Sequence, residues 1–559
     1  MDNKDPRKLD VAPVAVVAAA TLASRVLGLV RDSLTAAVFG AGGLLSAFFT
    51  AFQLPNLFRR LLGEGALTAA FVPVLNEELE RRRREGAFRL VNEVASWLLV
   101  VSAAVTGAAM VFFSQPAWIE AAARAFGGDD AVVARWLASG GMTVALFPYL
   151  VFVCLAAVFS SALQTLGRFL EPAVSPAWLN VAMIAALVIG WKCWPDGGGA
   201  LADIADIAGA GGMRMRLLCA GVLIGGAGQM VLPAWALARR GWRPRFALAL
   251  SGPVRAIFRL MAPTVLGSAV YLVNMTVARF IALSLNDGAV ALLNFAQRLM
   301  ELPIGVFAVA VSTVVFPLIS RRAAQGDMEG MAEGYRRGMR LVLLVNVPAA
   351  AGLAVLAVPL IGVLFQRGAF AAGDTLAMAP VLAVCAAGLP FFSFVNLMLR
   401  AFYARRDTRT PVLAAGLSFV VNLGLSLALM RRFGTAGLAA AGSVAIAAQA
   451  VFLQIRLTAA EGRLAFRFVR RDLGKIIAAS VAMGAAVRGG WLAWEACAGT
   501  GSKWADAAGL GLMIAAGAAV YGALAWLLRV EGLGELAGVL RRRFGKGGNR
   551  AGENGGGKG

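Results

Sequence analysis

Long apolar runs recur along the whole chain, and they constrain its fold more than any other feature. Of the 559 residues, 59% are hydrophobic and only 15% are charged. About 20 consecutive apolar residues are enough for a helix to cross the hydrocarbon core of a bilayer. The runs are continuous rather than alternating, which disfavours a transmembrane β-barrel. We therefore expect an all-α polytopic membrane protein.

Counting runs of this length predicts about fourteen transmembrane helices. The expected spans lie near residues 13–39, 43–62, 90–114, 137–163, 172–194, 216–238, 260–285, 288–319, 341–366, 377–404, 411–430, 436–456, 475–497 and 507–529. The tail after Lys546 is polar and rich in glycine, and we expect it to be disordered.

Basic residues gather in alternate connections between the expected spans. They occupy the N-terminus, the even-numbered connections and the tail, for example at Lys8, Arg83, Arg240, Arg337, Arg406, Arg470 and Arg542. Arg431 and Arg432 are the exception. The positive-inside rule then places both termini in the cytoplasm. The same loops account for the net charge of +22, so no nucleic-acid partner is indicated.

Residues suited to catalysis or to metal binding are scarce. The sequence has no histidine, and its five cysteines are scattered without a CxxC pair. The GxxxxGK[ST] pattern of a phosphate-binding loop is absent. We therefore expect no enzyme activity, no catalytic residue, no metal site and no cofactor.

Several arginines interrupt the apolar segments, where charge is costly. Arg25 and Arg31 lie in the first span, Arg59 ends the second, and Arg298 with Glu301 interrupts the eighth. An arginine at the bilayer centre costs roughly 2.5–3.5 kcal/mol on insertion scales. Guanidinium groups suit carboxylate and phosphate, so the pattern indicates an anion handled in a polar cavity.

Local explanations remain open for some of these arginines. Arg59 and Arg60 could extend toward the nearby interface, and Arg31 could pair with Asp32. Arg298 and Glu301 are three residues apart and share a helix face, so an ion pair is expected there. Arg25 sits near mid-span, and we expect Arg298 to face it across the cavity.

Several blocks are similar to the MurJ/MviN family of bacterial lipid II flippases. They are Ser24-Arg25-Val26-Leu27-Gly28-Leu29-Val30-Arg31-Asp32, residues 47–60, 64–66 and 70–73, Arg298-Leu299-Met300-Glu301-Leu302-Pro303 and residues 402–411. The resemblance implies the fold of the multidrug/oligosaccharidyl-lipid/polysaccharide exporter superfamily. It implies two six-helix lobes (1–245 and 246–460), two further C-terminal helices (461–535) and a cytoplasmic tail (536–559).

The resemblance also implies a function. The family moves lipid II, an undecaprenyl-pyrophosphate disaccharide-pentapeptide, from the cytoplasmic to the outer leaflet of the inner membrane. Alternating access is expected, with membrane lipids as surroundings and cell-wall synthesis proteins as candidate partners. The substrate-binding residues implied are Arg25, Arg31, Asn56, Arg59, Arg298 and Glu301.

The chain departs from the family pattern in two places. Many members have an aspartate where this chain has Ser46. A sodium site proposed for some members uses carboxylates on the seventh and eleventh spans, where this chain offers Asn274, Asn422 and Ser426 as the polar candidates. Sodium coupling and coupling to the membrane potential both stay open. Two other functions stay open as well: a flippase for another polyprenyl-linked glycan, and a small-molecule exporter of the same superfamily.

Overall fold

The structure is a computed structural model. It describes residues 11–62, 66–194, 209–310, 319, 322, 325–405, 407–466, 469–498 and 502–534. The tail after Lys546 lies outside these residues. The described part is helical and contains no strand, so the all-α class is confirmed.

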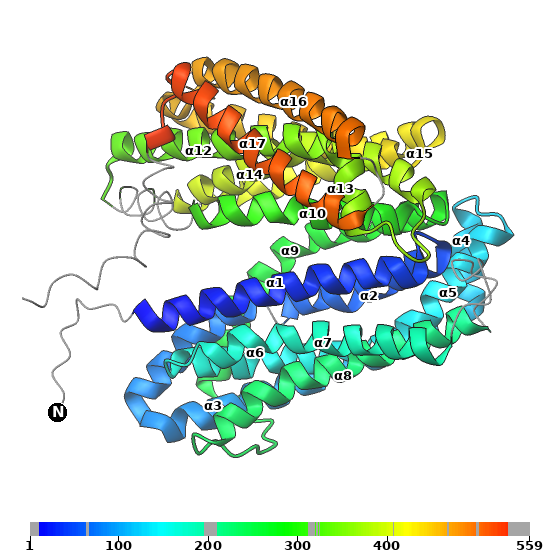
Figure 1. Ribbon diagram of the computed structural model, residues 1–559. Coiled ribbons are helices and arrows are strands. Elements are labelled where there is room, and N and C mark those ends of the chain that lie inside the picture. Colours follow the sequence, from blue (N-terminus) through cyan, green and yellow to red (C-terminus); the bar gives the residue numbers. More distant parts are fainter. Residues whose placement is uncertain are drawn as a thin grey trace, which may run out of the picture. The chain divides into compact units, whose positions relative to one another are not determined.

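The helices of the described part follow one another along the chain (Figure 1). Their bounds are α1 Val11–Phe39, α2 Gly43–Leu62, α3 Ala66–Phe113, α4 Pro116–Ala125, α5 Asp130–Leu146, α6 Tyr149–Thr165, α7 Leu170–Cys193, α8 Ala210–Ala238, α9 Gly252–Leu285, α10 Ala289–Ala310, α12 Met328–Val355, α13 Ala357–Leu364, α14 Ala372–Ala404, α15 Arg409–Ala460, α16 Arg470–Ala498 and α17 Lys503–Leu527.

Two of these helices are broken. The backbone leaves the helical conformation at Arg83 in α3 (φ 54°) and at Gly434 in α15 (φ 55°). Glycine adopts a positive φ without steric penalty, which explains Gly434. The break at Gly434 falls between two of the spans expected from the sequence, 411–430 and 436–456.

Eight helices of the described part are long and apolar enough to cross a membrane. The count is nine if α5 and α6 form one span, since they are bent by 44° at Phe147 and Pro148. This confirms the prediction that the chain has many apolar helices long enough to cross a membrane. The number fourteen stays a prediction.

The chain forms two compact units. The first comprises Met1–Asn294 with Phe365–Asp374, and the second comprises Phe295–Leu364 with Thr375–Gly559. The lobe boundaries expected at 245, 460 and 535 stay predictions, because compactness alone does not define lobes of six helices.

In the first unit, α7 packs against α1 and α8, while α6 packs against α3 and α8 (Figure 1). Helix α9 packs against α3 and α2. A buried cluster that includes Phe71, Phe147 and Leu150 fills the space between α3, α6 and their neighbours. This packing fixes α1 and α2, which carry most of the candidate site.

In the second unit, α16 (orange in Figure 1) packs against α12 (green) and α17 (red). Met483, Val487 and Trp491 of α16 form a buried cluster with Leu510 of α17. Gly509 allows the close approach, because a Cβ at this position would lie 2.4 Å from the Trp494 ring.

Candidate functional site

Arg31 is held inside the first unit by two side chains. Its Nε and Nη2 donate to Asp32 Oδ1 at 2.9 and 2.6 Å, and its Nη1 donates to Asn180 Oδ1 at 2.9 Å. The Arg31 side chain is 13% exposed and that of Asp32 only 5%. The local pair considered from the sequence is therefore present. Arg31 uses three of its five N–H donors in these bonds and keeps two.

Asn180 on α7 is a site residue that the sequence analysis did not identify. Its amide Nδ2 donates to the Ser24 carbonyl at 3.1 Å, while its Oδ1 accepts from Arg31. One buried amide therefore ties the backbone of α1 beside Arg25 to the Arg31 guanidinium. An asparagine inside an apolar span was the available signal, because polar side chains in membrane helices bond across helices.

The other arginines of the first unit differ in their surroundings. Arg25 is exposed, and within the described chain its side chain makes no hydrogen bond or ion pair. It lies six residues before Arg31, so the two side chains leave α1 about 120° apart. Arg59 is half-buried near the end of α2. The Asn56 amide donates to the Phe52 carbonyl one turn earlier, at 2.9 Å.

The second unit contributes an ion pair on α10. Arg298 Nη1 donates to Glu301 Oε2 at 2.6 Å, which confirms the pair expected from their spacing. The Arg298 side chain is 33% exposed and that of Glu301 is 61% exposed. Arg25 and Arg298 belong to different units, so their approach across a cavity stays a prediction.

At one end of the first unit, the turn between α1 and α2 is held by two other connections. We call residues 37–46, 287–291 and 365–370 together the α1–α2 clamp. Ala369 N donates to the Ala37 carbonyl at 2.8 Å. The buried Ser46 hydroxyl donates to the Asp287 carbonyl at 2.5 Å and accepts from Ala291 N at 3.3 Å. Ser46 thus binds the backbone of the α9–α10 connection and the start of α10.

Glycines make the close approaches in the α1–α2 clamp. Gly40 and Gly368 have φ values of +63° and +57°. A Cβ on Gly368 would lie 2.3 Å from the Ala37 carbonyl oxygen, and one on Gly40 would lie 2.8 Å from that of Ala369. Any larger side chain at these positions would push the connections apart.

The described residues of the block 402–411 lie at the end of α14, in the connection and at the start of α15. The Asp407 carboxylate accepts from the Thr410 hydroxyl at 2.7 Å and from the backbone N–H groups of Arg409 and Thr410, both at 3.0 Å. The Thr410 hydroxyl is the main cause of a lowered Asp407 pKa. These bonds satisfy backbone donors at the helix start, so the carboxylate has a local structural role. Among the described residues, no three His, Cys, Asp or Glu side chains lie close enough to hold a metal ion.

Removing the Asn180 amide should impair any function that depends on Arg31. We expect Asn180→Ala to slow transport roughly 3–30-fold, because an interhelical hydrogen bond in a membrane is worth about 0.6–2 kcal/mol. The measurement is the initial transport rate in proteoliposomes. Asn396→Ala is the control, since Asn396 is exposed and donates only to the Phe392 carbonyl of its own helix. Equal transport rates for Asn180→Ala and Asn396→Ala would show that Asn180 has no role in the site.

Comparison with known proteins identifies related sequences over most of the chain. A family model described as "Lipid II flippase MurJ" matches residues 35–498. A probable lipid II flippase MurJ of Rhizobium meliloti (strain 1021) is 34% identical over 437 residues, which cover 78% of each protein. One of Rhizobium tropici is 32% identical over 534 residues, covering 94% of this chain and 96% of the relative.

Solved structures with the same fold include two kinds of transporter. A lipid II flippase MurJ in an inward closed conformation matches with a TM-score of 0.70 and 22% identity, covering 95% of this chain and 99% of that one. An inward-facing multidrug resistance transporter of the MATE family matches with a TM-score of 0.60 and 14% identity, covering 80% of this chain and 98% of that one. At these identities the likeness concerns the fold alone.

Proposed function

Since the chain belongs to the MurJ family of lipid II flippases, we propose that it moves lipid II from the cytoplasmic to the outer leaflet of the bacterial inner membrane by alternating access. The family match over residues 35–498 carries this proposal. The protein then acts as a transporter that leaves its substrate chemically unchanged. Lipid II is its main partner, and cell-wall synthesis proteins that deliver or consume lipid II are candidate protein partners.

The pyrophosphate is the part of the substrate that the arginines suit. Several forked cations can share its oxygens, because guanidinium groups bind phosphate in bidentate fashion. We assign binding to Arg25, Arg59 and Arg298, and to the two N–H donors that Arg31 keeps. Glu301 orients Arg298 through their ion pair. Asn56 lies on α2 one turn before Arg59 and is a neutral hydrogen-bond donor or acceptor there. The long lipid tail stays in the bilayer.

The α1–α2 clamp supports alternating access. By the positive-inside rule the clamp lies at the outer end of the helices. Three hydrogen bonds between connections hold it: one from Ala369 to Ala37 and two at Ser46. Each is worth about 0.5–1.5 kcal/mol, so the clamp can open at modest cost. A transporter that releases its substrate outward needs such a breakable closure on that side.

Lipid retention by the purified protein tests the substrate. We expect native mass spectrometry to show at least tenfold more bound lipid II than bound undecaprenyl phosphate, because the pyrophosphate presents two phosphate groups, and so more acceptor oxygens, to the arginines. Arg298→Ala should reduce this preference. Equal retention of the two lipids would overturn the pyrophosphate assignment. Preferential retention of another polyprenyl-linked glycan, added at the same concentration, would favour that alternative substrate.

The proposed orientation is tested by cysteine labelling of intact spheroplasts. The unmodified chain carries exposed thiols at Cys193 and Cys497, which the positive-inside rule places outside. We expect a membrane-impermeant maleimide to label them. Residues 40–43 are poor labelling sites, since Gly40, Ala41 and Gly43 are buried.

The matched control removes both exposed thiols by Cys193→Ser and Cys497→Ser and adds one new cysteine. Asp130→Cys, at an exposed position beside α4, should label from outside. Arg83→Cys, at the break in α3, should label only after lysis. Labelling of Arg83→Cys in intact spheroplasts would invert the topology.

A further inference from the structure

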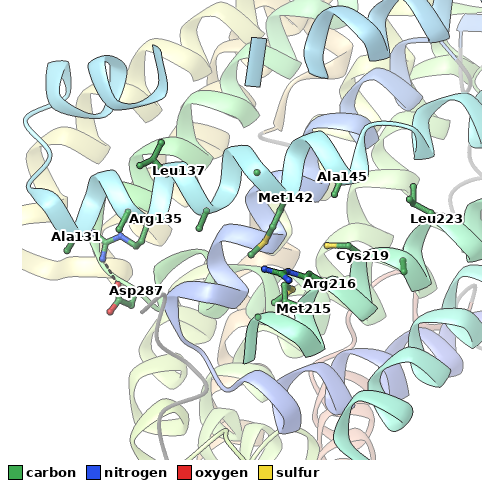
Figure 2. A pocket seen from close by; sticks show the side chains of 15 residues that line it. Ala131, Arg135, Leu137, Met142, Ala145, Met215, Arg216, Cys219, Leu223 and Asp287 are labelled. Carbon is green, nitrogen blue, oxygen red and sulfur yellow. Dashed lines mark hydrogen bonds and ion pairs between the residues drawn. The ribbon is translucent and has the colours of Figure 1, made fainter. Parts of the chain in front are cut away.

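A large crevice separates α5 from α8 in the first unit (Figure 2). Its volume is about 1090 Å³. Both walls come from helices of the same unit, and Asp287 from the α9–α10 connection completes it. The crevice is distinct from the candidate arginine site, because none of Arg25, Arg31, Asn56 and Arg59 lines it.

The walls of the crevice are apolar. The α5 side includes Ala134, Ala138, Gly141 and Met142, and Met215 and Cys219 lie on the α8 side. The α8 side runs from Gly212 to Leu223, about 16 Å at 1.5 Å per residue. That length matches one leaflet of a hydrocarbon core about 30 Å thick. An acyl chain fits both the chemistry and the length.

Two arginines stand at one level of this apolar crevice. Arg135 lies five residues after the start of α5 and Arg216 six residues after the start of α8. Both are therefore about 8–9 Å along the axis from the helix ends. When the ends of α5 and α8 project slightly beyond the hydrocarbon core of the bilayer, this distance places both arginines where the phosphate groups of lipids meet that core.

Arg135 has one donor without a hydrogen-bond partner in the described part of the chain. The residue is 7% exposed, and its Nη1 pairs with Asp287 (Figure 2). Its Nε is buried and has no hydrogen-bond partner among the described residues. A buried donor without an acceptor costs about 1–3 kcal/mol, and more when it is charged. Arg216 lines the same crevice, is exposed, and makes no ion pair within the described chain.

We propose that this crevice binds an anionic phospholipid, with an acyl chain between α5 and α8 and the phosphate at Arg216 and Arg135 Nε. With Asp287 offsetting one of the two cations, one positive charge remains for the phosphate. An apolar helix from a partner protein would fill the walls but offer Arg135 no acceptor. A soluble phosphate would satisfy the arginines but leave the apolar walls uncovered. By the proposed orientation the lipid belongs to the outer leaflet.

Native mass spectrometry of the purified full chain tests the proposal with phosphatidylglycerol and phosphatidylcholine at equal concentrations. We expect phosphatidylglycerol to bind roughly tenfold more tightly than phosphatidylcholine, and Arg216→Ala and Arg135→Ala each to lower its affinity about tenfold. Gly141→Leu should weaken binding of both lipids, because a Cβ at Gly141 meets nothing within 4 Å and the new side chain would occupy the crevice.

Matched variants outside the crevice control for lost charge and added bulk. Arg124→Ala removes a cation from neighbouring α4, where Arg124 pairs with Glu120 and Asp130. Gly107→Leu adds the same bulk to α3, where a Cβ also meets nothing within 4 Å. Both should bind phosphatidylglycerol as the unmodified chain does.

The proposal is overturned if Arg216→Ala and Arg135→Ala bind phosphatidylglycerol as Arg124→Ala does. Displacement of the lipid by glycerol 3-phosphate alone would identify a soluble-anion site instead. A dimer mass that Gly141→Leu abolishes would identify a helix–helix interface. Because lipid II retention should be unchanged in all five crevice and control variants, failure here would leave the proposed transport function untouched.

Discussion

Arg25→Ala and Arg298→Ala are each expected to abolish complementation of a strain depleted of its own lipid II flippase. Each change removes charge-assisted hydrogen bonds to the pyrophosphate, and each such bond contributes about 1.5–3 kcal/mol. Removing a cation from a span makes insertion easier, so loss of function would not reflect poor insertion. Growth of the depleted strain is the measurement, with protein level checked by immunoblot.

The controls separate specific binding from general loss of positive charge. Arg432→Ala removes an exposed arginine at the break in α15 and should leave growth normal. Glu301→Ala should impair growth less than Arg298→Ala, because Glu301 orients the cation. Lysine should rescue a position that supplies only charge, but not one that needs the forked geometry. Normal growth of the Arg25→Ala, Arg298→Ala double variant would exclude both arginines from the mechanism.

Gly368→Val is expected to prevent closure of the α1–α2 clamp and to reduce transport at least tenfold. A Cβ at this position would lie 2.3 Å from the Ala37 carbonyl oxygen, so the connection has to move away. The thiol of Ala41→Cys, placed at a buried position of the clamp, should then react faster with an impermeant maleimide. This measurement uses the chain with Cys193→Ser and Cys497→Ser.

Gly127→Val is the matched control for the clamp. Gly127 also has a positive φ, of +74°, but a Cβ there meets nothing within 4 Å. Both substitutions share the backbone strain of a left-handed residue, about 1–2 kcal/mol. Only Gly368→Val adds the clash with Ala37. If the two variants transport lipid II equally well and Ala41→Cys reacts at the same rate in both, the clamp has no role in transport.

The amino-acid sequence by itself determined the all-α class, the many membrane-crossing segments and the family. Length and continuity of apolar runs are enough for the first two, since backbone groups in lipid must bond within a helix. Two polar contacts were also accessible from the sequence: Arg298 with Glu301 and Arg31 with Asp32. Their partners are three residues and one residue apart, so a single helix already brings them together.

Only the tertiary structure decided which distant residues meet. Asn180 reaches Arg31 across 149 positions, and Ser46 binds the backbone at Asp287 across 241. The spacing of residues along one helix shows which side chains share a face, but it does not identify the helix that packs against that face. These contacts were therefore not predictable from the sequence. The crevice beside Arg135 arises in the same way, because it depends on how far α5 and α8 stand apart. Helix formation is local, whereas the packing of helix faces is a property of the whole unit.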